Sequence, residues 1–196
     1  MTCSKSDIDS AEKFISCMKS GGVAIVPTDT VYGFSAVVDI EGRPAYKSDS
    51  RIRRIKGRDE GKPLIQLISA PEDFRLFSDD RIPDMLLEKW PGPLTVIVNV
   101  KKHSPYLDNF ATVALRCPGD PWLRSAIAEI GAPIFSTSVN RSGFPVLDSI
   151  LEIEKEFSGD VDLLVCDGDK KDALPSTIVS MVDGELKILR RGAVEI

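Results

Sequence analysis

Short apolar runs alternate with helical patterns along most of the chain, and this order strongly constrains the fold. The strand-like runs are 23–27, 34–38, 64–69, 94–100, 112–117, 132–137, 162–166, 176–182 and 185–190. Most are separated by segments with the apolar spacing of helices, near 71–77, 82–90, 120–130 and 149–157. The last two runs flank Asp183-Gly184, which is typical of a hairpin turn and requires an antiparallel pair. The sequence therefore predicts an α/β fold with a twisted mixed β-sheet and flanking helices.

The N-terminal part contains two further expected helices. The first is expected to be capped by Asp7 or Asp9 and to end at Gly21. The second is expected to have Pro44 in its first turn and to reach about Ile55. No repeat, low-complexity segment or linker divides the sequence, so residues 1–196 are expected to form a single domain.

Several function classes are disfavoured by composition. No window has the roughly 18 uninterrupted apolar residues of a membrane span, and the polar N-terminus lacks the apolar core of a secretory signal. These features predict a cytoplasmic protein with no membrane association. The four cysteines are scattered without a paired motif, and His103 is the single histidine. A histidine-based catalytic triad or a histidine-rich zinc site is therefore not expected.

A run of basic residues stands out in this acidic chain. Six of the twelve residues from Arg51 to Lys62 are Lys or Arg, whereas the formal net charge of the whole protein is −5. A local cationic run around a glycine favours a focused anion site, most simply one for phosphates. The alternative is a solvated helix face, because cations near a helix C-terminus also suit the helix dipole.

Polar clusters occur at the ends of several predicted strands, where open α/β sheets bind ligands. They span residues 27–33, 56–63, 136–143 and 175–179. Each cluster taken alone is equally consistent with a capped turn or an ordinary polar loop.

Together, the clusters form an ordered set of motifs. The set comprises PTDTVYGF (27–34), IKGR (55–58) followed by KPL (62–64), WPGPLT (90–95), VALRCP (113–118), STSVNRSG (136–143), PSTIV (175–179) and ILRRGA (188–193). With these motifs the sequence resembles the YrdC-like threonylcarbamoyl-AMP synthase family, in its short, single-domain form. The resemblance extends from about Gly21 to Ala193.

The resemblance implies a nucleotidyltransferase that condenses L-threonine, bicarbonate and ATP into threonylcarbamoyl-AMP and releases pyrophosphate. The product would supply threonylcarbamoyladenosine modification of tRNA, with tRNA threonylcarbamoyl transferase proteins as downstream partners. Mg²⁺ is expected to be held mostly by phosphates and water, so no metal-ligating residues are predicted.

The resemblance also implies roles for individual residues. The predicted catalytic residues are Lys56 and Arg58, which are also expected to bind the triphosphate together with Lys62. The predicted L-threonine site contains Thr30, Arg116, Ser138 and Ser176, with Tyr32 at the pocket wall. Arg116 is the natural partner of the amino acid's carboxylate. The remaining nucleotide contacts are expected from Thr112, Asn140 and Arg190. Within the basic run, Arg51, Arg53 and Arg54 are expected on a solvated helix face instead.

Two other functions stay open, one because of departures from the family pattern and one because the same basic residues could bind RNA. Asp59 follows the KGR motif where proline is common, and Asp148 lies where hydroxyl residues are usual. The segment between Tyr32 and Lys56 is also longer than usual. One alternative is therefore a paralogue that adenylates another carbamoyl substrate. The other is a module that binds double-stranded RNA or the ribosome, although the negative net charge weighs against it.

Overall fold

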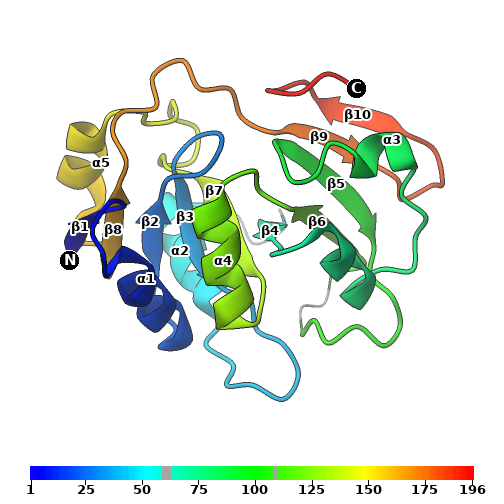
Figure 1. Ribbon diagram of the computed structural model, residues 1–196, viewed down its shortest axis with the longest axis horizontal. Coiled ribbons are helices and arrows are strands. Elements are labelled where there is room, and N and C mark those ends of the chain that lie inside the picture. Colours follow the sequence, from blue (N-terminus) through cyan, green and yellow to red (C-terminus); the bar gives the residue numbers. More distant parts are fainter. Residues whose placement is uncertain (59–62, 108–109) are drawn as a thin grey trace.

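A computed structural model describes residues 1–58, 63–107 and 110–196, and within them one ten-stranded mixed sheet runs through the molecule (Figure 1). The strand order is β1-β8-β2-β3-β7-β4-β6-β5-β9-β10. The strands are β1 (Thr2–Ser4), β2 (Ala24–Val26), β3 (Gly33–Val37), β4 (Ile65–Leu67), β5 (Leu94–Asn99), β6 (Thr112–Arg116), β7 (Ile134–Ser138), β8 (Leu163–Cys166), β9 (Thr177–Ser180) and β10 (Lys187–Arg190). The predicted α/β fold with a twisted mixed sheet is confirmed.

Parallel and antiparallel pairs both occur along this sheet. β8 pairs in parallel with β1 and β2, as do β4 with β6 and β5 with β9, whereas the other neighbours are antiparallel. The expected hairpin is confirmed: β9 and β10 are antiparallel, and Gly184 has the left-handed φ of 77° between them.

Helices cover the sheet unevenly. They are α1 (Ser10–Lys19), α2 (Ser48–Lys56), α3 (Asp84–Leu87), α4 (Pro121–Ile130), α5 (Ile150–Phe157) and the 3₁₀ helix η1 (Pro71–Leu76). Helices α1 and α4 pack on one face, over β8, β2, β3 and β7. The opposite face is covered by α2 and α5 in that half and by the η1–α3 segment over β6, β5 and β9. Farther along the first face, side chains of β4, β6, β5 and β9, including Ile65, Ala114, Ile97 and Ile178, line a cavity.

The starts of the first two helices compare differently with the expectation. Asp9 is the N-cap residue of α1, as expected, but its side chain makes no capping hydrogen bond and pairs with Lys13 at 2.8 Å instead. Helix α2 begins at Ser48 rather than at Pro44. The residues before it stay in a loop because the Asp39 carboxylate accepts the backbone N–H groups of residues 46 and 47.

Strand β1 was not expected, since its sequence is short and polar. It forms through parallel pairing with β8, in which Cys3 lies opposite Val165. Among the described residues, no helix has the length and apolar character needed to cross a membrane.

Candidate functional site

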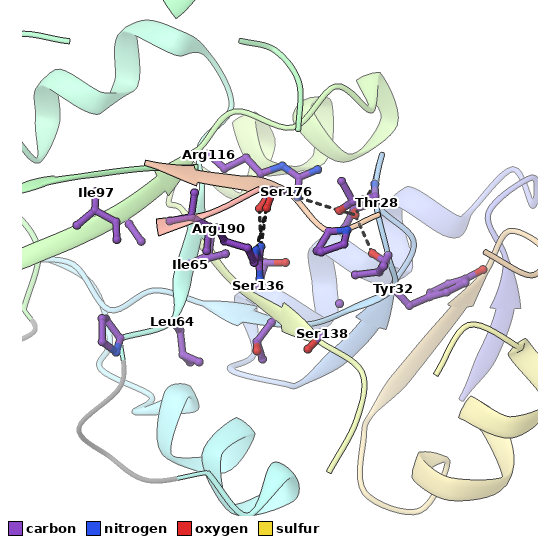
Figure 2. Close-up of a pocket in the computed structure, with 18 of the residues that line it drawn as sticks. Thr28, Tyr32, Leu64, Ile65, Ile97, Arg116, Ser136, Ser138, Ser176 and Arg190 are labelled. Atoms are coloured by element: carbon purple, nitrogen blue, oxygen red, sulfur yellow. Dashed lines mark hydrogen bonds between the residues drawn. The ribbon is translucent and has the colours of Figure 1, made fainter. Parts of the chain in front are cut away.

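A cavity of about 220 Å³ lies on the sheet, where several strands begin or end (Figure 2). Its polar lining consists of Thr28, Thr30, Arg58, Arg116, Ser136, Thr137, Ser138, Ser176 and Arg190. Apolar side chains of the sheet complete it, among them Ile65, Ile97, Ala114 and Ile178. The fold thus brings together residues that are up to about 160 positions apart in the sequence.

The turn after β2 presents a hydroxyl to the cavity. The Thr28 hydroxyl donates to the carbonyl of Val31 at 2.8 Å and accepts the N–H of Thr30 at 3.1 Å. Thr28 therefore stabilises the turn, which is the structural role that the sequence left open for this cluster. The hydroxyl of Thr30 accepts a hydrogen bond from Nη1 of Arg116 at 3.0 Å.

Arg116, the last residue of β6, is 4% exposed and is oriented by three oxygens. Its Nε donates to the carbonyl of Gly92 at 3.3 Å, and its Nη2 lies 2.5 Å from Oδ1 of Asp29. Burial lowers the pKa of Arg116, whereas Asp29 opposes that shift. A guanidinium has five N–H donors, so two of them remain for a ligand after these contacts and the Thr30 bond.

A second guanidinium group reaches the cavity from the edge strand β10. Arg190 donates to the carbonyl of Ser176 through Nε at 3.0 Å and Nη2 at 2.8 Å. Its Nη2 also donates to the Ser176 hydroxyl at 3.1 Å, which is 2.8 Å from the hydroxyl of Thr95. Burial lowers the pKa of Arg190, and the nearby charge of Arg116 lowers it further.

Arg58, just beyond the end of α2, supplies the third guanidinium group. It donates to the Thr137 hydroxyl at 3.5 Å and to the carbonyl of Pro63 at 3.2 Å. Among the described residues, its buried Nε has no hydrogen-bond partner. Burial lowers the pKa of Arg58, followed by the charge of Arg53. The predicted cation Lys62 and its neighbour Asp59 lie outside the described residues.

Lys56 and Asn140 lie beside the cavity and are not among its lining residues. The Lys56 amine donates to the carbonyl of Ser138 at 2.5 Å, and to the carbonyl and side-chain oxygens of Asn140 at 2.9 and 2.8 Å. The Ser138 hydroxyl donates to the same side-chain oxygen at 2.7 Å. All three N–H groups of Lys56 are thus used, and its direct contact with phosphate stays a prediction.

Tyr32 and Thr112 differ from the other predicted residues in where their side chains lie. Tyr32 borders the cavity, but its ring points away from it (Figure 2). Its hydroxyl donates to the carbonyl of Gly168 at 2.7 Å and accepts the N–H of Asp167 at 2.8 Å. Burial raises the pKa of Tyr32 to about 12. Thr112 begins β6 and is not among the lining residues, although it shares a face with Ala114 two positions on.

Arg51, Arg53 and Arg54 were expected on a solvated helix face, and this prediction is wrong for two of them. Arg53 is buried, with Nε 3.4 Å from Asp49, and Arg51 forms an ion pair with Asp162 at 2.5 Å. Only Arg54 is exposed. The inward stripe of α2 includes residues 52, 53, 55 and 56, and this helical spacing buries Arg53, which was expected to face solvent, together with Lys56.

Five polar residues in or beside the site were not predicted as site residues: Thr28, Asp29, Thr95, Ser136 and Thr137. Asp29 stands inside the PTDT motif, and its carboxylate was available to pair with a buried arginine. Thr137 directly precedes the predicted Ser138. Thr95 ends the WPGPLT motif, but its bond to Ser176 could not be predicted because it depends on the pairing of β5 with β9.

Comparisons with known proteins identify relatives of this chain. A relative from Methanocaldococcus jannaschii, provisionally named a threonylcarbamoyl-AMP synthase, is 29% identical over 179 residues, which cover 90% of this chain and 83% of the relative. The threonylcarbamoyl-AMP synthase of Pseudoalteromonas translucida is 27% identical over 190 residues, covering 92% and 98% of the two chains.

A solved structure is also similar. The crystal structure of P. abyssi Sua5 complexed with L-threonine matches with a TM-score of 0.80 and 28% identity. The match covers 93% of this chain and 54% of the Sua5 chain, so this protein spans about half the length of that relative. The family model Sua5_yciO_yrdC, described as "Telomere recombination", matches residues 16–192. The chain therefore belongs to the Sua5/YciO/YrdC family.

Proposed function

We propose that this protein is an L-threonylcarbamoyladenylate synthase, which condenses L-threonine, bicarbonate and ATP and releases pyrophosphate. The observation that carries the proposal is the meeting of three guanidinium groups, those of Arg58, Arg116 and Arg190, at one hydroxyl-rich cavity. In a chain with a net charge of −5, such a concentration of cations, with Arg116 buried and Arg58 half-buried, favours an anionic substrate. The relatives named as threonylcarbamoyl-AMP synthases support the choice of substrates.

L-Threonine would bind at the Arg116 end of the cavity. The two unused N–H groups of Arg116 suit a carboxylate, and Asp29 and Thr30 already fix the plane of the guanidinium. The hydroxyls of Thr30, Ser138 and Ser176 are suited to the amine and side chain of the amino acid. The structure of P. abyssi Sua5 complexed with L-threonine supports threonine as the ligand.

ATP would place its phosphates between Arg190 and Arg58, with Lys62, Thr112 and Asn140 as further contacts. The lowered pKa values of Arg58 and Arg190 arise from burial and from neighbouring positive charge. A bound phosphate would relieve that repulsion, so affinity for an anion is built into the empty cavity. Lys56 would then act by holding Asn140 and the end of β7, or as a direct contact once those bonds rearrange.

The chemistry asks mainly for positioning. Bicarbonate and the threonine amine give a carbamate with loss of water, and a carbamate oxygen attacks the α-phosphorus. The bond from the α-phosphorus to the bridging oxygen breaks, and pyrophosphate leaves with that electron pair. The guanidinium groups stabilise the charge that develops on the phosphate oxygens, while the fixed cavity keeps the two reactants in contact.

Mg²⁺ would be bound through the nucleotide. Among the described lining residues there is no carboxylate, and Asp29 is engaged by Arg116. Phosphate oxygens and water are the usual ligands of Mg²⁺ in such sites. When bound, the ion would neutralise phosphate charge during pyrophosphate release.

The product is a reactive mixed anhydride, so a tRNA threonylcarbamoyl transferase would have to consume it. This role would place the enzyme with tRNA in the cytoplasm. Direct RNA binding remains a separate hypothesis, and a steep fall of RNA affinity with salt would indicate it.

The decisive experiment is an assay of pyrophosphate release with ATP, bicarbonate and a panel of amino acids. Release should require both L-threonine and bicarbonate, whereas dependence on another amino acid would favour the paralogue alternative. Arg116→Lys should mainly raise KM for threonine, and Arg58→Ala should lower kcat/KM for ATP by about 10²-fold or more. Arg54→Ala, which removes an exposed cation from the same basic run, is the control and should leave both parameters unchanged. Wild-type release that is independent of threonine would contradict the proposal.

A further inference from the structure

Helix α2 ends in a way that leaves two carbonyl groups to be satisfied from elsewhere. Gly57 has a left-handed φ of 62°, and its N–H donates to the carbonyl of Arg54 at 3.2 Å. The N–H of Arg58 donates to the carbonyl of Arg53 at 2.9 Å. This pair of bonds is a Schellman motif, and it does not satisfy the carbonyls of residues 55 and 56.

The segment after Asn140 supplies both missing donors. Nη1 of Arg141 donates to the carbonyl of Ile55, and the N–H of Ser142 donates to the carbonyl of Lys56 at 2.7 Å. The loop that carries Ser138 and Asn140 into the site therefore also completes the cap of the helix that carries Lys56 and Arg58.

Arg141 is itself held in place from α5. Its Nε donates to Oε1 of Glu156 at 2.8 Å and its Nη2 to Oδ2 of Asp160 at 2.9 Å. The guanidinium also lies 4.6 Å from the centre of the Phe157 ring. Since the Arg141 side chain is 40% exposed, these ion pairs add little stability, but they fix the orientation of the fork.

We infer that Arg141 is a positioning residue for the nucleotide half of the site. It holds the C-terminal end of α2 against the loop after β7, and so sets the separation between Arg58 and Asn140. Arg58 lines the cavity and Asn140 lies beside it on a different element, so a shift of one relative to the other would weaken the proposed phosphate contacts. The kinetic part of this inference rests on the proposed function, whereas the structural part does not.

Only an arginine can make all of these contacts at once. Three nitrogens of its planar fork donate in three directions, to Ile55, Glu156 and Asp160. A lysine keeps the charge near the helix end but brings a single ammonium group, which cannot span α2 and α5 together. Arg141→Lys therefore separates positioning from charge.

The test compares Arg141→Ala and Arg141→Lys with the double variant Glu156→Gln, Asp160→Asn. The double variant removes the charge of both ion pairs but keeps an amide oxygen at each position to accept from the Arg141 fork. The orientation of the fork and its contact with Ile55 are thereby retained, so the double variant is the matched control. For both Arg141 variants, kcat/KM for ATP should fall about tenfold or more, while KM for threonine changes less than about twofold. The control should keep kcat/KM for ATP within about threefold of wild type, because its ion pairs are exposed.

A second readout does not depend on turnover. Amide hydrogen exchange, followed by NMR, should show the N–H groups of Gly57 and Arg58 exchanging about tenfold faster in Arg141→Lys than in the control. The hydrogen-exchange measurement also distinguishes failure of the proposed function from failure of the proposed role of Arg141. Wild-type protein without threonine-dependent turnover would contradict the proposed function. Exchange at the Arg58 amide would still decide the role of Arg141. Unchanged exchange at both amides, or an equal loss of kcat/KM for ATP and for threonine in the Arg141 variants, would overturn the inference.

Discussion

Lys56 illustrates how burial changes the behaviour of a cation beside the site. The side chain is 3% exposed, and burial followed by the charge of Arg58 lowers its pKa to about 8. In the unfolded chain the same amine has a pKa of about 10.4. Between these two values the unfolded state binds more protons than the native state. The contribution of Lys56 to the free energy of unfolding should therefore rise with pH across this window and fall as pH drops through 8.

We predict that this pH dependence disappears in Lys56→Met. The difference in the free energy of unfolding between wild type and variant should shift in favour of wild type from pH 7.5 to about 10. Denaturant titrations at several pH values would measure it. Tyr32, Cys17 and Cys117 have raised pKa values and act in the opposite direction at alkaline pH, but they are present in both proteins and cancel. Lys155→Met, at an exposed position of α5, controls for the loss of a lysine. If the difference in the free energy of unfolding between wild type and Lys56→Met did not change with pH, the assignment would be contradicted.

At the level of elements, the sequence predicted those helix starts and turns that are set by contacts between nearby residues. The Asp183-Gly184 turn specified the β9–β10 hairpin, and Asp120, which caps α4 by accepting the N–H of Leu123 at 3.1 Å, marked that helix. The start of α2 was wrong because Asp39, several residues earlier, holds the preceding backbone in a loop. Strand β1 was missed because it forms only by pairing with β8, which lies far away in the sequence.

For the candidate site, too, local motifs predicted some features, whereas contacts with distant residues determine others. Motif residues such as Arg116, Ser176 and Arg190 were predicted, and the sheet brings them to one cavity. The orientation of side chains could not be read from the motifs, because it depends on partners in other elements. Tyr32 turns towards Gly168, and the Lys56 amine towards Asn140, for this reason.

The segment after β10 gives an element-level prediction. Gly192 packs against the residues just before β9, and its N–H donates to Thr177 Oγ1 at 3.0 Å. A Cβ atom at Gly192 would lie 2.2 Å from the carbonyl oxygen of Pro175, so Gly192→Ala must displace backbone next to Ser176. We expect a higher KM for threonine together with lower stability, measured by steady-state kinetics and thermal unfolding.

Gly184→Ala is the matched control for this substitution. A Cβ there meets nothing within 4 Å, and the cost is the positive φ alone, about 1–2 kcal/mol. Stability should fall while KM for threonine stays at the wild-type value. Equal KM values in both variants would show that the backbone around Ser176 tolerates the displacement.

On the scale of the whole molecule, one sheet joins regions with different cores. The cluster under α1 and α4 and the cluster under η1 and α3 lie on opposite faces and in opposite halves of the sheet. Each contains one of the two tryptophans: Trp122 stacks on Phe14 at 5.5 Å, and Trp90 donates to the carbonyl of Leu94 at 2.6 Å. The strands β7, β4 and β6 connect the two halves by continuous backbone pairing.

This continuity predicts that the two halves unfold together, as expected if residues 1–196 form a single domain. Trp90→Phe leaves only Trp122 to report on one half, and Trp122→Phe leaves only Trp90 to report on the other. Within each variant, the denaturant midpoints from tryptophan fluorescence and from far-ultraviolet circular dichroism should coincide, because breaking the sheet at β4 would expose both cores at once. Comparing probes within one protein removes any difference in stability between the two variants. If fluorescence and circular dichroism instead gave separate midpoints in either variant, the halves would be independent folding units and the single-domain prediction would be wrong.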